Sequence, residues 1–316
     1  MESEFQKIED YITLEILGGD RFRSQNLMPH FMLLQPGVNG GQLVAHSLRA
    51  AYYTVDQEYR VHSLHSYFLY PATTDAPIFY EVNRERDGKK YITRVVKASQ
   101  NGRKIFNLAC SFSKKQRGEF NHEYKIPSVP DPDTLMSEED RAKSAAKNPK
   151  CTPLSRMVLE TMYQKPYRPI DFRVTYSNPD EGIFLPMTKS NHRYVWFRMR
   201  GKLTDDPVVH ECALAYASDE EYLYTACIPL GIAFNTDPYI TALASLDHII
   251  YFHDEFRADE WLLIESESPL LKNTRGLVLG RIYRQNGTLV ASVVQEGVVG
   301  LKRGNLEEDI MKDSKI

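Results

Sequence analysis

Alternating apolar and polar positions predict a run of antiparallel strands in the first third of the chain. The segments Ile78–Arg86, Lys89–Gln100 and Arg103–Ser113 are separated by Asp87-Gly88 and Asn101-Gly102. Both dipeptides tolerate positive φ and favour tight hairpins between strands. The three segments therefore predict an antiparallel meander.

A helix and a further strand are predicted before this meander. Residues Gly40–Val55 are small and apolar, and they follow Asn39, whose side chain is a favourable helix N-cap. The segment His62–Tyr70 has the character of another strand. The first half therefore predicts one helix followed by four antiparallel strands.

The second half repeats this order. Asp206 and Pro207 form a helix start before the apolar run Val208–Tyr216, and Asn286-Gly287 is a second-half hairpin turn. The strand candidates are Asp247–His253, Trp261–Glu267, Gly276–Arg284 and Thr288–Gly300. The first of them is expected to open at Ser245, two residues earlier.

The two halves align as copies of one domain. Ser63-Leu64-His65 aligns with Ser245-Leu246-Asp247, and Asn101-Gly102 aligns with Asn286-Gly287 at nearly the same offset. Between the copies, Ser137 and the acidic residues after it predict a short capped helix. The predicted organisation is a domain at 1–115, a polar linker at 116–165, a domain at 166–303 and a flexible tail at 304–316.

Composition narrows the class of protein. Of the 316 residues, 42% are hydrophobic and 26% are charged, and the formal net charge is −3, which argues against disorder and against a nucleic-acid partner. No apolar run reaches the roughly 18 residues of a membrane span. The acidic segment Met1–Glu4 precedes no apolar stretch, so no secretory signal is expected.

Several familiar catalytic and metal motifs are absent from the sequence. There is no Gly-x-Ser-x-Gly elbow, no phosphate loop and no dinucleotide fingerprint, and His210-Glu211 lacks the second histidine of a zinc helix. We expect no metal and no tightly bound cofactor. Reduced, buried thiols in an intracellular compartment are expected for the four cysteines, Cys110, Cys151, Cys212 and Cys227.

Three polar residues of the second half lie among apolar neighbours. Asp219 follows an apolar run, Ser245 opens a strand, and Gln295 interrupts Val290–Val299. In the alignment of the halves, Gln295 takes the place of Cys110 on an apolar strand face. A buried amide costs about 1–3 kcal/mol unless its hydrogen bonds are made, so we expect partners for Gln295.

Short motifs occur in order through both halves. In the first half they are Asn39–Gln42, Val61–Phe68, Tyr80–Val82 and Arg86–Gly88. In the second half they are Cys212–Asp219, Ser245–His248, Phe252-His253, Phe256–Asp259, Ser268-Pro269, Arg275–Leu277 and Gln295–Gly297. With these motifs the chain resembles the type II acyl-CoA thioesterases, a family of double hotdog proteins.

The resemblance implies an α+β fold of two hotdog domains, each an antiparallel sheet wrapped around a long central helix, with the sheets joined. It implies hydrolysis of fatty acyl-CoA to free fatty acid and coenzyme A by direct attack of water, with Asp219, Ser245 and Gln295 as catalytic residues. A leaving thiol with a pKa of roughly 8.5 departs with little acid help. An aspartate base and two polar side chains that hold the water, or donate to the developing charge, suit this reaction. With Cys110 in place of the glutamine in the first half, we expect one active site per chain.

The resemblance also points to a location. Serine at position 245, instead of the threonine of bacterial members, resembles the eukaryotic peroxisomal branch. Ser314, Lys315 and Ile316 differ by one conservative change from the peroxisomal address Ser-Lys-Leu, and Ile316 is the departure. The peroxisome matrix is the predicted location and its import receptor a predicted partner. A homo-oligomer is compatible with the fold, since sheet edges invite pairing.

Other functions remain open at this point. His65, His248 and His253 compete with Asp219 for the role of base. A hotdog enoyl-CoA hydratase would need an Asp and His pair, but Asp247 and His248 are neighbours on a strand and point to opposite faces. A non-catalytic acyl-CoA binding module is the alternative from another class. Cations that could meet the phosphates of coenzyme A are Arg84, Arg86, Lys89, Lys90, Lys272 and Arg275.

Overall fold

The computed structural model describes residues 7–29, 37–116, 118–149, 151, 153–164, 168–176, 178, 181–182, 187–220, 222–233, 236–304, 306 and 309. The first half contains α1 (Ile8–Ile12), β1 (Leu14–Gly18), β2 (Arg21–Ser24), α2 (Gly40–Tyr52), β3 (Tyr59–Phe68), β4 (Phe79–Asp87), β5 (Tyr91–Gln100) and β6 (Arg103–Lys114). The middle contains the 3-10 helix η1 (Pro132–Thr134), α3 (Glu138–Ala146) and α4 (Pro153–Gln164). The second half contains β7 (Ile170–Val174), β8 (His192–Met199), α5 (Pro207–Ala217), the 3-10 helix η2 (Leu223–Leu230), β9 (Tyr239–Ser245), β10 (Asp247–Phe252), β11 (Leu262–Lys272), β12 (Arg275–Arg284) and β13 (Leu289–Lys302).

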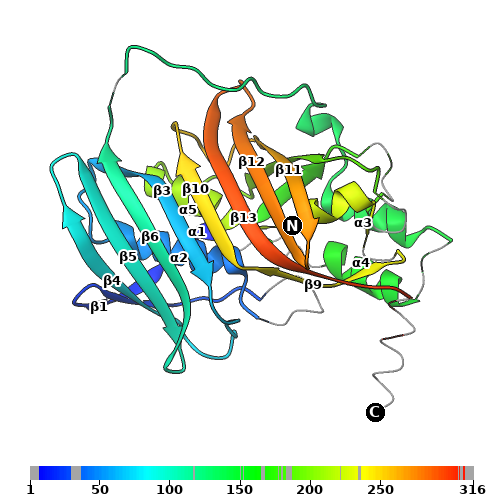
Figure 1. Cartoon of the computed structure of the whole chain (residues 1–316), viewed down its shortest axis with the longest axis horizontal. Helices are drawn as coiled ribbons and strands as arrows, with labels where there is room; N and C mark the ends of the chain where they lie inside the picture. Colours follow the sequence, from blue (N-terminus) through cyan, green and yellow to red (C-terminus); the bar gives the residue numbers. More distant parts are fainter. Residues whose placement is uncertain are drawn as a thin grey trace.

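Within the described residues, all thirteen strands belong to one antiparallel sheet (Figure 1). Its order is β1-β2-β4-β5-β6-β3-β10-β13-β12-β11-β8-β7, and β9 pairs with β13 beside this path. Strands β3 and β10 join the two halves, with Leu64 opposite Ile250 and His65 opposite Ile249. The continuous antiparallel sheet implied by the resemblance is confirmed.

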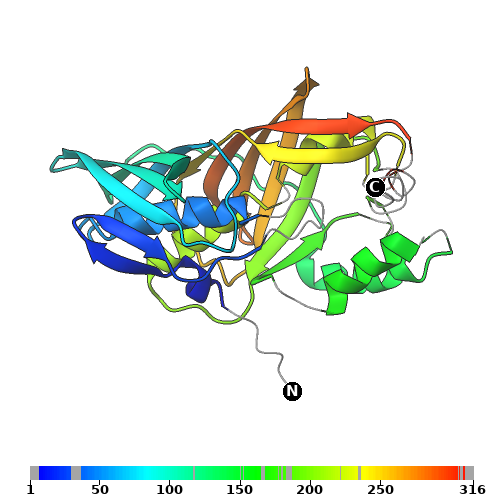
Figure 2. The same cartoon turned by 90° about the horizontal axis from the view of Figure 1, so that it is seen from below.

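Helix α2 lies inside the first half of the sheet. It contacts β1 and β2 on one side and β4, β5 and β6 on another, and Figure 2 shows it between the blue hairpin and the cyan strands. The Asn39 side chain accepts a hydrogen bond from the Gln42 amide at 3.3 Å, which caps the predicted helix start. The helix ends at Tyr52, three residues before the predicted end, where Thr54 Oγ1 donates to the Ala51 carbonyl.

Helix α5 packs directly against α2. The Asp206 side chain accepts from the Val208 amide at 3.0 Å, so the predicted helix start is confirmed. The two helices meet so closely that a Cβ added to Gly41 would lie 2.2 Å from the carbonyl oxygen of Tyr216. Glycine at position 41 is therefore required by the approach of the two halves.

Sequence patterns missed several elements of the second half. The short strands β7, β8 and β9 and the helix η2 were not predicted, and η2 is buried against β8, β9, β11, β12 and β13. The predicted strand Asp247–His253 is found as β10, but its predicted opening at Ser245 is wrong, because Ser245 is the last residue of β9 and β10 begins at Asp247. The break occurs because the Leu246 amide donates to the Glu296 carbonyl at 2.9 Å and the chain changes partners there.

The predicted linker contains more structure than its polarity suggested. Ser137 Oγ accepts from the Asp140 amide at 2.9 Å, which confirms the predicted cap of α3. Helix α4 was not predicted. Its Leu159 and the neighbouring Cys151 join a small buried cluster with the alanines of α3. Among the described residues, no helix has both the length and the apolar character to cross a membrane.

Gly41→Ala should destabilise the protein. The added methyl group has no room beside Tyr216, so α2 and α5 must separate, at a cost of about 1–3 kcal/mol in the free energy of unfolding. Urea denaturation measures this. Gly118→Ala is the control, because its new Cβ would have no contact closer than 3.8 Å. Equal stability of the two variants would contradict the tight approach of the helices.

Candidate active site

The structure brings Asp219, Ser245 and Gln295 into direct contact. Gln295 Nε2 donates to Asp219 Oδ1 at 2.6 Å and to Ser245 Oγ at 2.8 Å. Ser245 Oγ donates to Asp219 Oδ1 at 3.3 Å. The three side chains thus form a closed hydrogen-bonded triangle, although they lie far apart in the sequence.

Strand pairing places two corners of this triangle. In the pairing of β9 with β13, Ser245 lies opposite Gly297, two residues from Gln295. Residues two apart share a strand face, so Ser245 and Gln295 lie on one side of the sheet. A Cβ on Gly297 would lie 2.4 Å from Leu223 and 2.8 Å from the Ala244 carbonyl, so the glycine allows β9 and η2 to pack this closely against β13.

The first half of the chain closes the site around Asp219. The Gly41 backbone N–H donates to the Asp219 carboxylate, and a Cβ on Gly40 would lie 2.5 Å from Asp219 Oδ2. The carboxylate therefore sits at the N-terminus of α2, where unpaired N–H groups favour an anion. The sequence marked Asn39–Gln42 as a motif but did not connect it to Asp219. Two adjacent glycines at a helix start were the available signal.

Burial raises the pKa of Asp219 to about 6. The hydrogen bonds from Gln295, Ser245 and Gly41 act in the opposite direction, and the negative charge of Glu220 adds to the rise. Asp219, taken as a whole residue, is half-buried. A carboxyl group with this pKa is mostly ionised at pH 7 and is a stronger base than an ordinary aspartate.

Gln295 is completely buried, and its carbonyl oxygen has no hydrogen-bond partner among the described residues. The orientation of the amide follows from Asp219, because the carboxylate accepts only from the NH₂ end. The predicted partners of Gln295 are thus found for its nitrogen. The free Oε1 needs a donor, and a water molecule bound beside the triangle would supply one.

The three competing histidines make their hydrogen bonds elsewhere. His248 is fully buried and its Nε2 lies 2.9 Å from Ser218 Oγ, while burial lowers its pKa to about 3. His253 bonds to Ser292 Oγ at 2.8 Å, and the ring of His65 meets Tyr251 edge to face. None of these contacts includes Asp219.

The Asp247 and His248 pair expected of a hydratase is not formed. Asp247 Oδ1 accepts from the Glu296 amide at 3.0 Å, whereas His248 faces Ser218 on the other side of the strand. The cysteine that aligns with Gln295, Cys110, is buried, and burial raises the pKa of its thiol. In the described part of the chain, no group of three His, Cys, Asp or Glu side chains is arranged to hold a metal.

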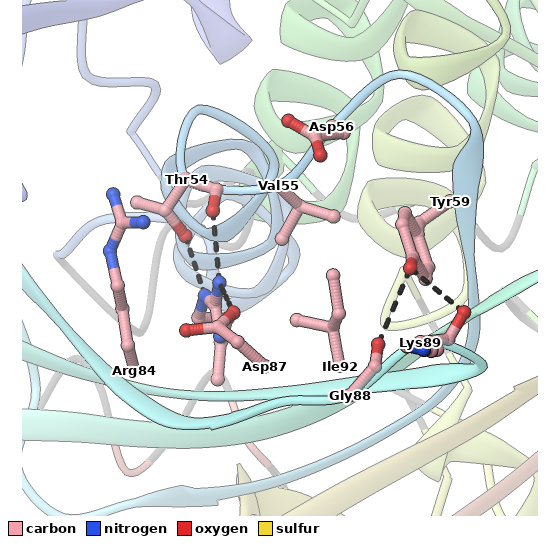
Figure 3. Close-up of a pocket in the computed structure, with 10 residues that line it drawn as sticks. Thr54, Val55, Asp56, Tyr59, Arg84, Asp87, Gly88, Lys89 and Ile92 are labelled. Carbon is pink, nitrogen blue, oxygen red and sulfur yellow. Dashed lines mark hydrogen bonds and ion pairs between the residues drawn. The ribbon is translucent and has the colours of Figure 1, made fainter.

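A pocket of about 400 Å³ lies at the other end of α2, beside the β4–β5 hairpin (Figure 3). Two of its three basic residues are paired within the protein: Arg94 bonds to Asp87 and to Thr54, and Arg84 bonds to Asp20, while Lys89 is the third. This pocket is separated from Asp219 by the length of α2, about 20 Å. A second pocket of about 740 Å³ is lined by charged residues, several of them paired, including Arg257 with its aspartate partners. Neither pocket includes the triangle.

Comparison with known proteins identifies the family. The family described as acyl-CoA thioesterase matches residues 172–298, and the acyl-CoA thioesterase N-terminal domain matches residues 29–113. Human acyl-coenzyme A thioesterase 8 is 34% identical over 292 residues, which cover 92% of this chain and 88% of the relative. The chain belongs to the acyl-CoA thioesterase family. The family and the enzyme class implied by the sequence motifs are confirmed.

Further relatives agree with this assignment. The peroxisomal acyl-coenzyme A thioester hydrolase 1 of Saccharomyces cerevisiae is 28% identical over 303 residues, covering 83% of this chain and 86% of its own. The crystal structure of acyl-CoA thioesterase II TesB2 from Mycobacterium marinum superimposes with a TM-score of 0.72 at 34% identity, covering 93% of this chain and 98% of that one. A hotdog-fold protein from Alicyclobacillus acidocaldarius, at 17% identity and a TM-score of 0.68 over 92% of this chain and 97% of its own, shows the same fold.

The buried His248 should make stability depend on pH. Its pKa is about 3 in the folded protein and about 6.5 in the unfolded chain, so the unfolded state binds a proton first as the pH falls. The buried neutral ring therefore contributes fully to the free energy of unfolding above pH 6.5. This contribution is lost as the pH falls, and the loss is about 2 kcal/mol between pH 7 and pH 5. In His248→Gln, urea unfolding at these two pH values should lose about 2 kcal/mol less than in the wild type. Equal losses would contradict the low pKa.

Proposed function

We propose that this protein hydrolyses fatty acyl-CoA to free fatty acid and coenzyme A by direct attack of water. The hydrogen-bonded triangle of Asp219, Ser245 and Gln295 carries the proposal. It offers a base with a raised pKa and an unpaired carbonyl oxygen beside it. Membership of the acyl-CoA thioesterase family supports the choice of substrate.

In the proposed reaction, Asp219 takes a proton from a water molecule whose oxygen attacks the thioester carbonyl carbon. The other proton of the water is held by Gln295 Oε1. The tetrahedral intermediate then collapses, the carbon–sulfur bond breaks, and the electron pair leaves with the thiolate of coenzyme A. The proton on Asp219 passes to the thiolate or to solvent, which returns the enzyme to its first state.

Ser245 and Gln295 support the base in different ways. Gln295 uses both hydrogens of Nε2, one toward Asp219 and one toward Ser245, so it fixes the other two side chains. Ser245 contributes a longer hydrogen bond of 3.3 Å to Asp219. We therefore assign Gln295 the larger share in orienting the carboxylate and the water. At the start of α2, the Gly41 N–H donates to Asp219 and the Gln42 N–H to Asn39, which leaves the Gly40 N–H, among the described residues, to stabilise the developing oxyanion.

We further propose the double hotdog description in full. On this view α2 is the central helix of a domain at 1–115, and α5 with η2 fills the corresponding place in a domain at 166–303. The segment 116–165 connects them and 304–316 is the tail. The contacts of α2 with strands on two sides support this division, as do the contacts of η2 with five strands of the second half. The exposed edges of the sheet leave association into a homo-oligomer as part of the proposal.

We propose a peroxisomal location. The yeast relative, a peroxisomal acyl-coenzyme A thioester hydrolase, supports it. Ser314, Lys315 and Ile316 lie outside the described residues, so their part in import stays a prediction from the sequence, as does the partnership with the import receptor.

Asp219→Asn should lower thiol release by about 10² or more, because the base is lost while the shape is kept. Thiol release is measured with a series of acyl-CoAs from short to long, which also gives the acyl-chain preference. In the wild type, kcat/KM should fall below about pH 6, since only the ionised carboxylate accepts a proton.

Ser245→Ala should lower the rate of thiol release about tenfold. Ser245→Thr should recover most of that rate because the hydroxyl remains.

Two outcomes would replace this proposal. Hydration of an enoyl-CoA without release of thiol would favour a hydratase. Tight binding of acyl-CoA without turnover, unaffected by Asp219→Asn, would favour a binding module.

A fluorescent fusion with the chain at its C-terminal end tests the location. Full-length protein should collect in puncta that coincide with a peroxisomal marker, and deletion of residues 314–316 should disperse it. Replacing Ile316 by Leu serves as the control and should retain the puncta. Puncta that persist after the deletion would contradict the role of these three residues.

A further inference from the structure

A buried carboxylate, that of Glu220, lies directly beside Asp219. Glu220 is the next residue in the chain, and its side chain is only 5% exposed. It takes no part in the proposed proton transfer. A buried carboxylate is costly unless it is paired and hydrogen-bonded, so its partners indicate what it does.

Three elements hold the Glu220 carboxylate. Asn39 Nδ2, at the start of α2, donates to Glu220 Oε1. The Arg168 guanidinium, just before β7, lies 3.7 Å from Glu220 Oε2. Tyr216, on α5, is also close enough to be affected: burial, and then the negative charge of Glu220, raise the pKa of its hydroxyl. The carboxylate thus connects α2, α5 and the strand region of the second half.

Asn39 links this arrangement to the site. Its Oδ1 caps the Gln42 amide of α2, while its Nδ2 holds Glu220. In the same turn of α2, the Gly41 N–H donates to Asp219. Two neighbouring carboxylates are therefore attached to one helix turn, and the backbone between them has little freedom to rotate.

The charge of Glu220 also acts on Asp219. Glu220 raises the pKa of Asp219, in addition to the effect of burial. Arg168 is shared with Glu138 of α3 at 3.4 Å, so it neutralises Glu220 only in part. The next titratable groups are Tyr216 on α5, which is affected by Glu220 and by Tyr11, and His248 on β10, which bonds to Ser218.

We propose that Glu220 is a positioning residue for the hydrolysis. Clamped by Asn39 and Arg168, it directs the Asp219 carboxylate toward Gln295 and keeps a negative charge beside the base. The inference rests on the proposed function, in which Asp219 accepts the proton of the attacking water.

Glu220→Gln tests the charge. It keeps the size of the side chain and an oxygen for Asn39, but removes the negative charge. Two readouts follow Asp219: its titration by ¹³C NMR with carboxyl-labelled aspartate, assigned by the signal missing in Asp219→Asn, and kcat/KM against pH with lauroyl-CoA. Both midpoints should move to lower pH by about half a unit, roughly threefold in the proton equilibrium.

Glu296→Gln is the matched control. It makes the same change next to Gln295, where the Glu296 side chain is paired with Arg275 and is 37% exposed. Its midpoints should stay at the wild-type position.

Glu220→Ala tests the clamp. It removes the bonds to Asn39 and Arg168 together, so kcat should fall at least tenfold with KM nearly unchanged, while Glu220→Gln keeps kcat within about threefold. Thermal melting of both variants shows that the compared proteins are folded.

Midpoints that stay in place in Glu220→Gln by both readouts would overturn the proposal. So would equal losses of kcat in the Gln and Ala variants, since a merely structural role predicts that result. A moved NMR midpoint in a protein that releases no thiol from any acyl-CoA would support the coupling of the two carboxylates and would overturn the proposed function instead.

Discussion

The close approach of the first turn of α2 to the end of α5 is the constraint on which the rest of this structure depends. Only glycine fits at position 41, because the carbonyl of Tyr216 occupies the place of a side chain. The contact joins the two halves at one defined distance. It also turns Asp219 toward the helix start, where backbone N–H groups receive it. The same contact therefore fixes both the packing of the two halves and the position of the Asp219 carboxylate.

The candidate site consists of polar groups whose burial in the apolar core lowers the free energy of unfolding. Gln295 is buried with one unpaired oxygen, and His248 is buried with Nδ1 unpaired among the described residues. Asp219 is ionised at neutral pH although burial opposes its charge. Such groups reduce stability, and they persist in enzymes where the chemistry needs a water molecule and a strong base in one place.

The two halves of the duplicated chain contribute different parts. The second half supplies the three polar side chains on β9, β13 and the turn after α5. The first half supplies the helix start that meets Asp219, and its Cys110, which the sequence alignment of the halves places opposite Gln295, is buried. The candidate site therefore combines side chains of the second half with backbone of the first half.

The sequence by itself determined the features that depend on a few neighbouring residues. The turns at Asn101-Gly102 and Asn286-Gly287, the caps at Asn39 and Asp206, and most long strands follow from local propensity and alternation. The short motifs were sufficient to indicate the family and the three candidate site residues, because they keep their order along the chain.

Only the tertiary structure decided how these residues meet. Asp219 and Gln295 are 76 residues apart, and their distance of 2.6 Å depends on the pairing of β9 with β13 and on the break at Leu246. The pKa of about 6 at Asp219 comes from burial and from Glu220. Burial, register and close approach are set by contacts between distant segments, and local propensity carries no information about such contacts.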